Sequence, residues 1–551
     1  MSTAVAPSPA IRAHRRSGLG RDPLAGTGAL LKFALRRDGI RILAWVCGVE
    51  AVALSTLLSF SSLYPDAASR AAFADSLGSQ PAFAVLTGKI FDSSLGGLTA
   101  WRVTLLGGVL AGLMSIFTVI RRTRTDEEAG RTELLASAAV GRAAPLLAAL
   151  GCALAGCVGI FVLVSGTLLV RGEDAAGALT LGLAIAGAGL LFAGVAAITA
   201  QLFDSARPAL GTAGLVLGIS FGIRAIADSG GDGSSWLRWL SPLGWAEEVR
   251  SFAVNRFWVI GMMLTAAVLL VAVALWLLGR RDIGLGLFPA RFGRARGTLE
   301  STSGLSDRLH RPAAIGWTVA LAGFGLMTGA IVDSAKDLFA DSARLSDILT
   351  MIGGPGAITD AVLNGLVGLC AILASIAAVS AAGRMITEEQ SERAALLLST
   401  TVSRSRWQAD HLLHVFAIPV VMLMAGGLAS GILHGARSGD FGDGFTDAMA
   451  AMLGQLPACW VIGAVAVLIH AWLPRIWVAS WVILVVAVLL GQLGPLLQLP
   501  QWLNDLVPFP HVSTIAGSGV PWLAELVLLA IAAALTAAGI VGFARRDLIS
   551  Q

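Results

Sequence analysis

The sequence has little charge for its length. Only 13% of its 551 residues are Asp, Glu, Lys or Arg, and 56% are hydrophobic, whereas a soluble domain is typically about 25% charged. Apolar runs of roughly 20 residues, each long enough to cross the hydrocarbon core of a bilayer, recur along the whole chain. This composition excludes an ordinary soluble protein and predicts an all-α polytopic membrane protein.

The sequence also lacks the motifs of several kinds of catalytic and metal site. An odd number of cysteines, all inside apolar runs, favours small packing residues over a disulfide framework or a metal site; they are Cys47, Cys152, Cys157, Cys370 and Cys459. The sequence holds no phosphate-binding loop of the form Gly-x-x-x-x-Gly-Lys-Ser/Thr and no His-Glu-x-x-His. Its one Gly-Lys pair, Gly88-Lys89, is followed by Ile90. We therefore expect no catalytic residue, metal or cofactor on this chain.

The apolar runs predict twelve spans in two sets of six. They cover about residues 40–63, 98–120, 143–170, 176–200, 208–226 and 257–279, then 313–333, 361–383, 410–434, 446–472, 476–495 and 521–543. The predicted domains are a tail with an interfacial amphipathic helix at 25–41 (1–39), a first half (40–279), a basic linker (280–312) and a second half (313–551).

The distribution of charge predicts the orientation. When the amino terminus is placed inside, most Lys and Arg fall on the cytoplasmic side, and acidic residues such as Asp333, Asp337 and Asp447 fall outside. This positive-inside bias predicts a multi-pass protein of the plasma (inner) membrane with both termini in the cytoplasm. The arginines of the 280–312 linker favour anionic lipid headgroups as a partner over nucleic acid.

A charged segment follows the second span and recurs 262 positions later. The matched pairs are Arg122 with Arg384, Thr125 with Thr387, Asp126 with Glu388, Glu127 with Glu389, Arg131 with Arg393, Leu134 with Leu396, Leu135 with Leu397 and Arg142 with Arg404. Arg280-Arg281-Asp282-Ile283 after the sixth span likewise matches Arg545-Arg546-Asp547-Leu548 at the carboxyl end. Six spans followed by six in the same orientation form a parallel repeat.

Both copies of the segment read Thr-x-x-Glu/Gln, which is a capping box. We expect each copy to form a short, independently capped cytoplasmic helix that docks onto a soluble partner. The alternative is that both are ordinary loop helices whose charges keep a loop in water. The repetition of cap, charges and leucines at one place in each half favours docking.

The residues predicted to couple the chain to its partner come from both copies. They are Thr125, Asp126, Glu127, Glu128, Gly130, Arg131, Glu133, Leu134 and Leu135, then Thr387, Glu388, Glu389, Glu392, Arg393, Leu396 and Leu397. We expect the carboxylates to meet basic residues of the partner and the leucines to occupy an apolar cleft.

Several motifs together resemble ABC-2 type exporter permeases. They are Glu-Glu-x-Gly-Arg-x-Glu-Leu-Leu at 127–135, Ser-Pro-Leu-Gly-Trp-Ala-Glu-Glu-Val-Arg at 241–250 and Arg-Arg-Asp-Ile-Gly-Leu-Gly at 280–286. The whole chain is similar to the fused twelve-span actinobacterial permeases of the polyketide-antibiotic and tetronasin-resistance type. The resemblance implies cytoplasmic coupling helices, two separate nucleotide-binding subunits that hold ATP and Mg, and export of a lipophilic or amphipathic compound such as an antibiotic. The second copy departs from the pattern with Ser391 and Glu392 in place of Ala129 and Gly130.

Glu50 lies near the middle of the first predicted span, where an ionised carboxylate is costly. It is a candidate for the substrate cavity; alternatively, it is protonated or hydrogen-bonded to a neighbouring span. Clustered glycines such as Gly107, Gly108, Gly187 and Gly189 predict faces where helices pack closely.

Two other function classes remain open. An ion-coupled secondary transporter, of the twelve-span drug/proton antiporter type, has the same architecture, but it would more often carry several intramembrane charges. A membrane enzyme would need a polar catalytic constellation, which the sequence does not show. Transport that needs ATP and survives loss of the membrane potential would separate the exporter from the antiporter.

Overall fold

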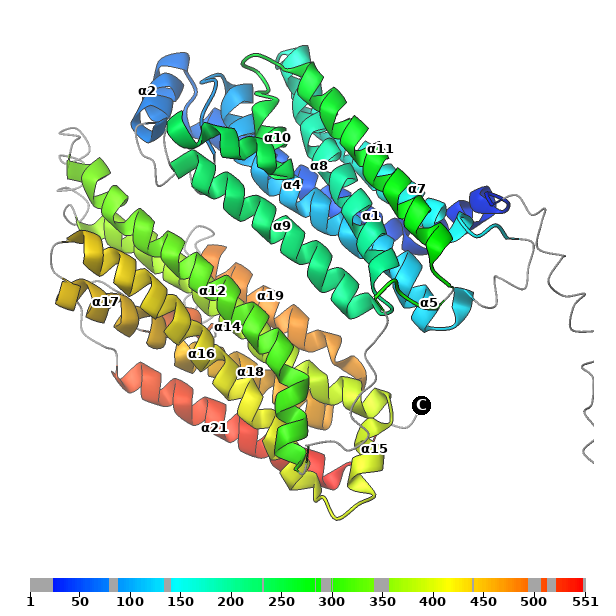
Figure 1. Ribbon diagram of the computed structural model, residues 1–551. Helices are drawn as coiled ribbons and strands as arrows, with labels where there is room; N and C mark the ends of the chain where they lie inside the picture. The colour runs from blue at the N-terminus through cyan, green and yellow to red at the C-terminus, as the bar shows by residue number, and fades with distance from the viewer. Residues whose placement is uncertain are drawn as a thin grey trace, which may run out of the picture. The chain divides into compact units, whose positions relative to one another are not determined.

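The computed structural model is helical and divides into two compact units, 1–292 and 293–551 (Figure 1). It describes residues 23–78, 88–132, 140–229, 232–282, 284–288, 299, 301–340, 356–438, 441–493, 507–512 and 522–548. Within these residues no strand is present beyond one isolated bridge between Phe203 and Phe288. The all-α prediction is confirmed, and the division between the units falls within the 280–312 segment.

The first unit contains six long helices and several short ones. Its elements are α1 (Thr27–Leu63), α2 (Ala67–Gly78), α4 (Leu95–Ile120), the π-helical turn η2 (Arg121–Thr125), α5 (Asp126–Glu128), α7 (Ala144–Val170), α8 (Ala175–Leu202), α9 (Ala206–Ser229), the 3-10 helix η3 (Asp232–Leu240), α10 (Pro242–Glu248) and α11 (Phe257–Arg280). In Figure 1, α2 and α10 lie at one end of this unit and α5 at the other. We call the end with α5 the elbow end.

The second unit repeats the pattern. Its elements are α12 (Thr302–Ala340), α14 (Gly356–Gln390), α15 (Arg393–Leu398), α16 (Arg404–Ser438), α17 (Phe441–Leu453), α18 (Leu456–Trp472), η4 (Pro474–Ile476), α19 (Val478–Leu493), η5 (Phe509–His511) and α21 (Trp522–Arg545). The predicted span 446–472 is divided here between α17 and α18.

Eleven helices in the described part of the chain are long and apolar enough to cross a membrane. They match eleven of the twelve predicted spans. The remaining prediction, 476–495, falls on α19, whose shorter apolar stretch runs from Val478 to Leu490. α19 ends where the described part of the chain is interrupted.

The first span differs from the prediction. The sequence suggests an interfacial helix at 25–41 followed by a separate span, but α1 is one helix of 37 residues. Its buried positions, among them Ala34, Asp38, Ile42 and Val46, keep one face against the unit throughout. The amphipathic segment is thus the first part of the spanning helix.

Small residues let the helices of each unit pack closely. A Cβ added at Gly112 on α4 would lie 2.9 Å from the ring of Phe192 on α8, and one at Gly189 on α8 would lie 2.7 Å from Cys157. In the second unit, a Cβ at Gly325 on α12 would collide with the backbone oxygen of Gly426 on α16. Packing drives helix association in lipid, so these contacts support the predicted role of glycines in helix-contact faces.

Candidate coupling sites

The first charged segment is the end of a span. The helix that begins at Leu95 continues through the π-helical turn and α5 to Glu128. Thr125 lies inside this run with helical backbone angles, and its side chain caps no amide. The chain then turns at Gly130, whose φ is +69°. We call residues 121–132 the first elbow. The predicted capping box at Thr125 is wrong, because the helix continues through Thr125 and does not begin there.

The second charged segment, residues 384–398, has the same character, and we call it the second elbow. Thr387 lies within α14, and its hydroxyl donates to the carbonyl of Gly383 at 3.1 Å, one turn earlier, so it caps nothing. The chain then turns at Glu392, whose φ is +60°. Glu392 stands at the place of Gly130, so the two elbows share a left-handed turn although their residues differ.

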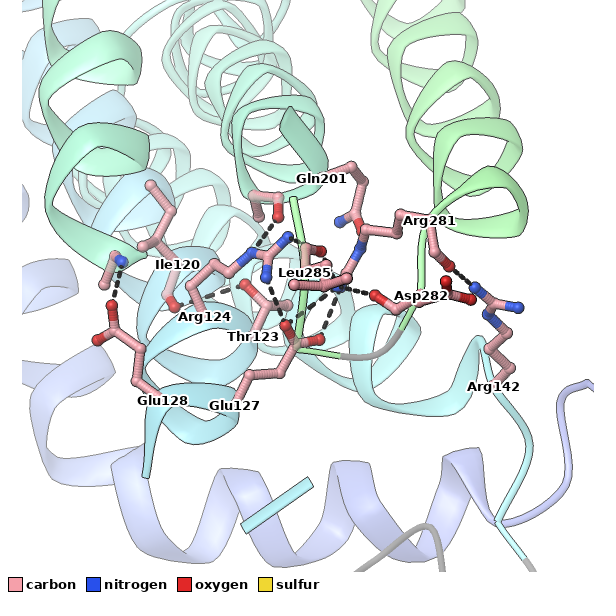
Figure 2. Close-up of polar contacts among 12 residues, drawn as sticks. Ile120, Thr123, Arg124, Glu127, Glu128, Arg142, Gln201, Arg281, Asp282 and Leu285 are labelled. Carbon is pink, nitrogen blue, oxygen red and sulfur yellow. Dashed lines mark hydrogen bonds and ion pairs between the residues drawn. The ribbon is translucent and has the colours of Figure 1, made fainter. Parts of the chain in front are cut away.

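Glu127 is the centre of the first elbow (Figure 2). Arg281, just after α11, donates to both of its oxygens, from Nη2 at 2.6 Å and from Nη1 at 3.1 Å. Arg124 donates to Oε2 at 2.7 Å, and both guanidiniums converge on this carboxylate. Paired charge-assisted hydrogen bonds of this kind fix geometry as well as adding attraction. We call the Glu127–Arg281 pair the first clamp.

Further contacts tie the first clamp to neighbouring helices. The Arg281 Nε donates to Gln201 at the end of α8 at 2.7 Å, and Arg142 donates to the backbone oxygen of Arg281. Arg124, which is fully buried, donates to the carbonyls of Ala200 and Leu285. The clamp therefore joins the first elbow to the ends of α8 and α11.

Glu389 is the centre of the second elbow. Arg546, just after α21, donates to its Oε1 at 2.7 Å, and the Nε2 of His470 lies 2.6 Å from the same oxygen. Arg404 donates to the backbone oxygen of Arg546 at 2.5 Å, as Arg142 does to Arg281. We call the Glu389–Arg546 pair the second clamp.

The two clamps are copies with different surroundings. His470 on α18 takes the part that Gln201 on α8 plays in the first half. Ile386 stands at the place of Arg124, so the second clamp lacks a counterpart of that second arginine. A second ion-pair set is repeated as well, since Asp126 pairs with Arg131 at 2.5 Å and Glu388 lies 3.8 Å from Arg393.

The predicted coupling residues fall into three groups. The carboxylates of Glu127, Glu388 and Glu389 pair with arginines of their own unit. This differs from the prediction that they would face outward toward a partner. Exposed residues are Thr125, Glu128, Arg131, Thr387, Glu392, Arg393 and Leu396, with Asp126, Gly130 and Leu397 half-buried. The backbone amide of Ala206, at the start of α9, donates to Glu128 at 2.7 Å. Glu133, Leu134 and Leu135 lie outside the described residues.

Arg281 and Arg546 were not among the predicted site residues. Each arginine points into its unit and pairs there with a glutamate, because a charged side chain removed from water needs a partner of opposite charge. The signal was present in the sequence, since Arg280-Arg281 and Arg545-Arg546 repeat with nearly the same offset as the elbows. Nothing local shows that these arginines meet a glutamate more than 150 residues away.

A cavity of about 200 Å³ opens beside the first clamp. It is lined by Thr123, Glu127, Thr132, Val140, Gly141, Arg142, Pro145, Leu146, Gln201, Leu278 and Arg281. The clamp thus borders a mixed polar and apolar hollow, and a side chain could enter it. Glu50 lies elsewhere, on α1, where its carboxylate accepts from the hydroxyl of Thr167 on α7. This contact matches the alternative of a hydrogen bond to a neighbouring span.

Comparison with known proteins places the chain in a family. The profile described as "Multidrug efflux system permease Rv1217c, C-terminal domain" matches residues 29–278 and 299–544. The multidrug efflux system permease protein Rv1217c of Mycobacterium tuberculosis (strain ATCC 25618 / H37Rv) is 37% identical over 538 residues, which cover 97% of this chain and 96% of that protein. The chain belongs to this efflux permease family. The two matched stretches of the permease each contain one elbow and most of one half.

Proposed function

We propose that this permease is the membrane-spanning subunit of an ATP-driven exporter of the ABC-2 type, which moves lipophilic or amphipathic drugs out of the cell. Two separate ATPase subunits, holding ATP and Mg, would bind at the two elbows. The relative's description as a multidrug efflux system permease supports drug export. The motif resemblance supports the ATPase partners, and the positive-inside distribution of Lys and Arg supports a plasma-membrane protein with both termini in the cytoplasm.

The duplicated clamps carry this proposal. Each clamp joins the exposed turn at the end of one span to the first residues after the last span of the same half. A displacement applied to the elbow therefore reaches α11 or α21 through a bonded pair rather than through a flexible loop. Alternating access needs such a link between the surface that receives force and the spans that move.

The partner surface is expected on the exposed side of each elbow. In the second elbow, Leu396 is 71% exposed, and Glu392 and Arg393 are exposed beside it. An exposed leucine between charged residues suits an interface with an apolar centre and a polar rim. The carboxylates that face inward would act as transmitters of motion, and the exposed residues would make the contact.

The test is transport by the purified permease with its co-purified partner in proteoliposomes. Export is expected to require ATP and to persist when ionophores remove the membrane potential. Export with no ATPase subunit bound would contradict the proposal and favour the ion-coupled antiporter.

The clamps are tested separately with Glu127→Gln and Glu389→Gln. Each substitution removes the charge that holds the clamp arginine. If this raises the barrier of the transport step by roughly 1.4 kcal/mol, the export rate falls by about tenfold. ATPase subunits should still co-purify, since the exposed surface is intact. Asp75→Asn, which neutralises an exposed carboxylate on α2, is the matched control and should leave export unchanged. Export at the original rate in both clamp variants would show that the clamps transmit nothing.

A further inference from the structure

A dense set of buried charges lies at the end of the first unit opposite the elbow. Arg224 and Asp228 come from the end of α9, Arg238 from η3, and Glu247 and Glu248 from α10; all five are buried. Arg238 donates to Glu248 at 2.8 Å. The coupling sites do not use this cluster. The sequence places Ser513 and Thr514 where the repeat would put Glu247 and Glu248, so these two carboxyl groups are not repeated at the matching positions.

Two of the three carboxyl groups meet each other. Asp228 accepts from the Arg224 Nε at 2.7 Å with one oxygen and from the Arg238 Nε at 2.6 Å with the other. The Glu247 Oε1 lies 3.3 Å from the same Arg224 Nε, so the two carboxyl groups are neighbours around one nitrogen. Two carboxyl groups this close repel each other when both are ionised, which favours a proton on one of them. Both oxygens of Asp228 accept from guanidiniums, which leaves Glu247 as the carboxyl group to carry the proton.

Burial is the main influence on the protonation of Glu247. Burial raises the pKa of Glu247 to about 8, and the negative charge of Asp228 contributes to the rise against the opposing effect of Arg224. Arg250 and Arg256, at the rim, pair with Glu248 at 3.0 Å and 2.7 Å.

A chain segment lies directly over Glu247. Gly88 has a φ of +82°, and a Cβ built on it would lie 2.7 Å from the Glu247 Oε1, so the backbone touches the carboxyl. Trp101 on α4 donates from Nε1 to the Gly88 carbonyl at 2.8 Å. The guanidinium of Arg250 lies 4.7 Å from the ring centre of Phe91. These contacts seat residues 88–92 against α4, α10 and the turn that follows α10.

A small cavity lies at this contact. Its volume of about 20 Å³ suffices for one water molecule, and Lys89, Asp92, Glu247 and Arg250 are among its lining residues. A water there would give the Glu247 proton a route out. The ionisable groups that face Glu247 are thus Arg224, Asp228, Arg238, Glu248, Lys89, Asp92 and Arg250.

The turn that follows α10 is held in an uncommon conformation. Arg250, Phe252 and Asn255 have φ values of +51°, +66° and +50°, which side chains other than glycine rarely adopt. The Asn255 side-chain oxygen accepts from the Phe252 amide at 2.9 Å and from the Thr180 hydroxyl at 3.0 Å. Residues held this way cluster where function requires a fixed geometry.

We propose that Asp228 and Glu247 form a buried proton-binding site, and that the bound proton keeps residues 88–92 seated over α10. Loss of the proton places a second negative charge beside Asp228, against the buried backbone of Gly88. Repulsion and desolvation then favour release of the segment, so that water reaches the new carboxylate. The site binds a proton and links its occupancy to the packing of this end of the first half.

The proton is tested by infrared difference spectroscopy of the full-length permease in nanodiscs of phosphatidylethanolamine and phosphatidylglycerol. Between about pH 6 and about pH 9.5, the carbonyl stretch of a protonated carboxyl should disappear with a midpoint near 8. Glu247→Gln, whose amide can still donate to Asp228, should lack this change. Glu50→Gln is the matched control and should retain it. A titrating signal that persists in Glu247→Gln, or that vanishes in Glu50→Gln, overturns the proposal.

Release of the segment is tested by maleimide labelling of Lys89→Cys in a Cys47→Ala background. The labelling rate is divided by that of Asp75→Cys on α2, which cancels most of the pH dependence of the thiol. The ratio should rise several-fold across the same pH range and stay flat when Glu247→Gln is added. A ratio that is flat with Glu247 present overturns the proposal, and this measurement needs no change at Glu247.

Discussion

At the scale of single residues, the clamps show how a buried charge is tolerated. The Glu127 side chain is 11% exposed and that of Arg281 is 4% exposed, so neither can be hydrated well. The attraction between the two charges offsets the free-energy cost of removing them from water, but only while Glu127 and Arg281 are both present. Removing one partner leaves the other buried and unpaired.

Arg281→Met should therefore destabilise the first half by about 3–5 kcal/mol. Thermal unfolding in detergent measures the change. In Glu127→Gln/Arg281→Met the loss should be smaller, because no unpaired charge remains. Arg280→Met, whose guanidinium lies 3.6 Å from the Trp276 ring centre, is the control and should cost about 1 kcal/mol or less. Equal losses for Arg280→Met and Arg281→Met would show that the clamp adds nothing.

Glu247 gives stability a definite pH dependence. Its pKa is raised from 4.5 to about 8, chiefly by burial, so the folded state holds the proton more tightly than the unfolded chain. The stabilisation is complete below the unfolded value and declines as pH rises toward about 8. Wild-type melting temperature should fall across this window, and Glu247→Gln should flatten that part of the profile. Parallel profiles for the two proteins would exclude the contribution of Glu247.

At the scale of elements, the two elbows reach the same turn with different residues. Gly130 has φ +69° and Glu392 has φ +60°. A residue with a Cβ is disfavoured in this conformation by roughly 1–2 kcal/mol. No atom lies within 4 Å of the position of a Cβ on Gly130, so the cost there is one of backbone conformation.

Glu392→Gly should consequently stabilise the second elbow by about 1 kcal/mol, and Gly130→Ala should destabilise the first by a similar amount. Hydrogen exchange at the elbow amides reports each change locally. Gly39→Ala, in α1 with open space around it, is expected to be neutral or stabilising because its backbone is helical. Destabilisation by Gly39→Ala as large as that by Gly130→Ala would refute the conformational explanation.

The sequence was informative wherever a property is local. Apolar runs located eleven of the spans, and the glycine clusters marked helix contacts such as Gly112 against Phe192. It was misleading at Thr125 and Thr387, where the pattern Thr-x-x-Glu/Gln predicted the start of a helix. The same pattern also occurs inside a longer helix, as it does at both of these positions. The Glu127–Arg281 and Glu389–Arg546 pairs could not be derived from local patterns, since they depend on how distant helices pack.

At the scale of the whole molecule, each unit has its own core. Residues such as Phe192, Leu191 and Met263 pack together in the first unit, and Met422, Trp407 and Phe543 do so in the second. Each clamp also lies within one unit. The units therefore do not depend on each other for their internal contacts.

Two separate chains, 1–292 and 293–551, should accordingly fold when co-expressed and recover drug export. Export from vesicles with both chains present measures this. A break between Ala188 and Gly189, in the buried middle of α8, should abolish export because it divides the first core. Failure of the pair divided at 292 while each part is stable would show that a continuous chain is needed.

The distance along the chain between the clamp partners is nearly constant, 154 residues in one half and 157 in the other. Duplication of a six-span unit accounts for this spacing, although the neighbouring positions differ, with Arg124 and Gln201 in the first half and Ile386 and His470 in the second. In a related chain, a glutamate after the second span followed about 155 residues later by an arginine would mark the end of the first half in the amino-acid sequence.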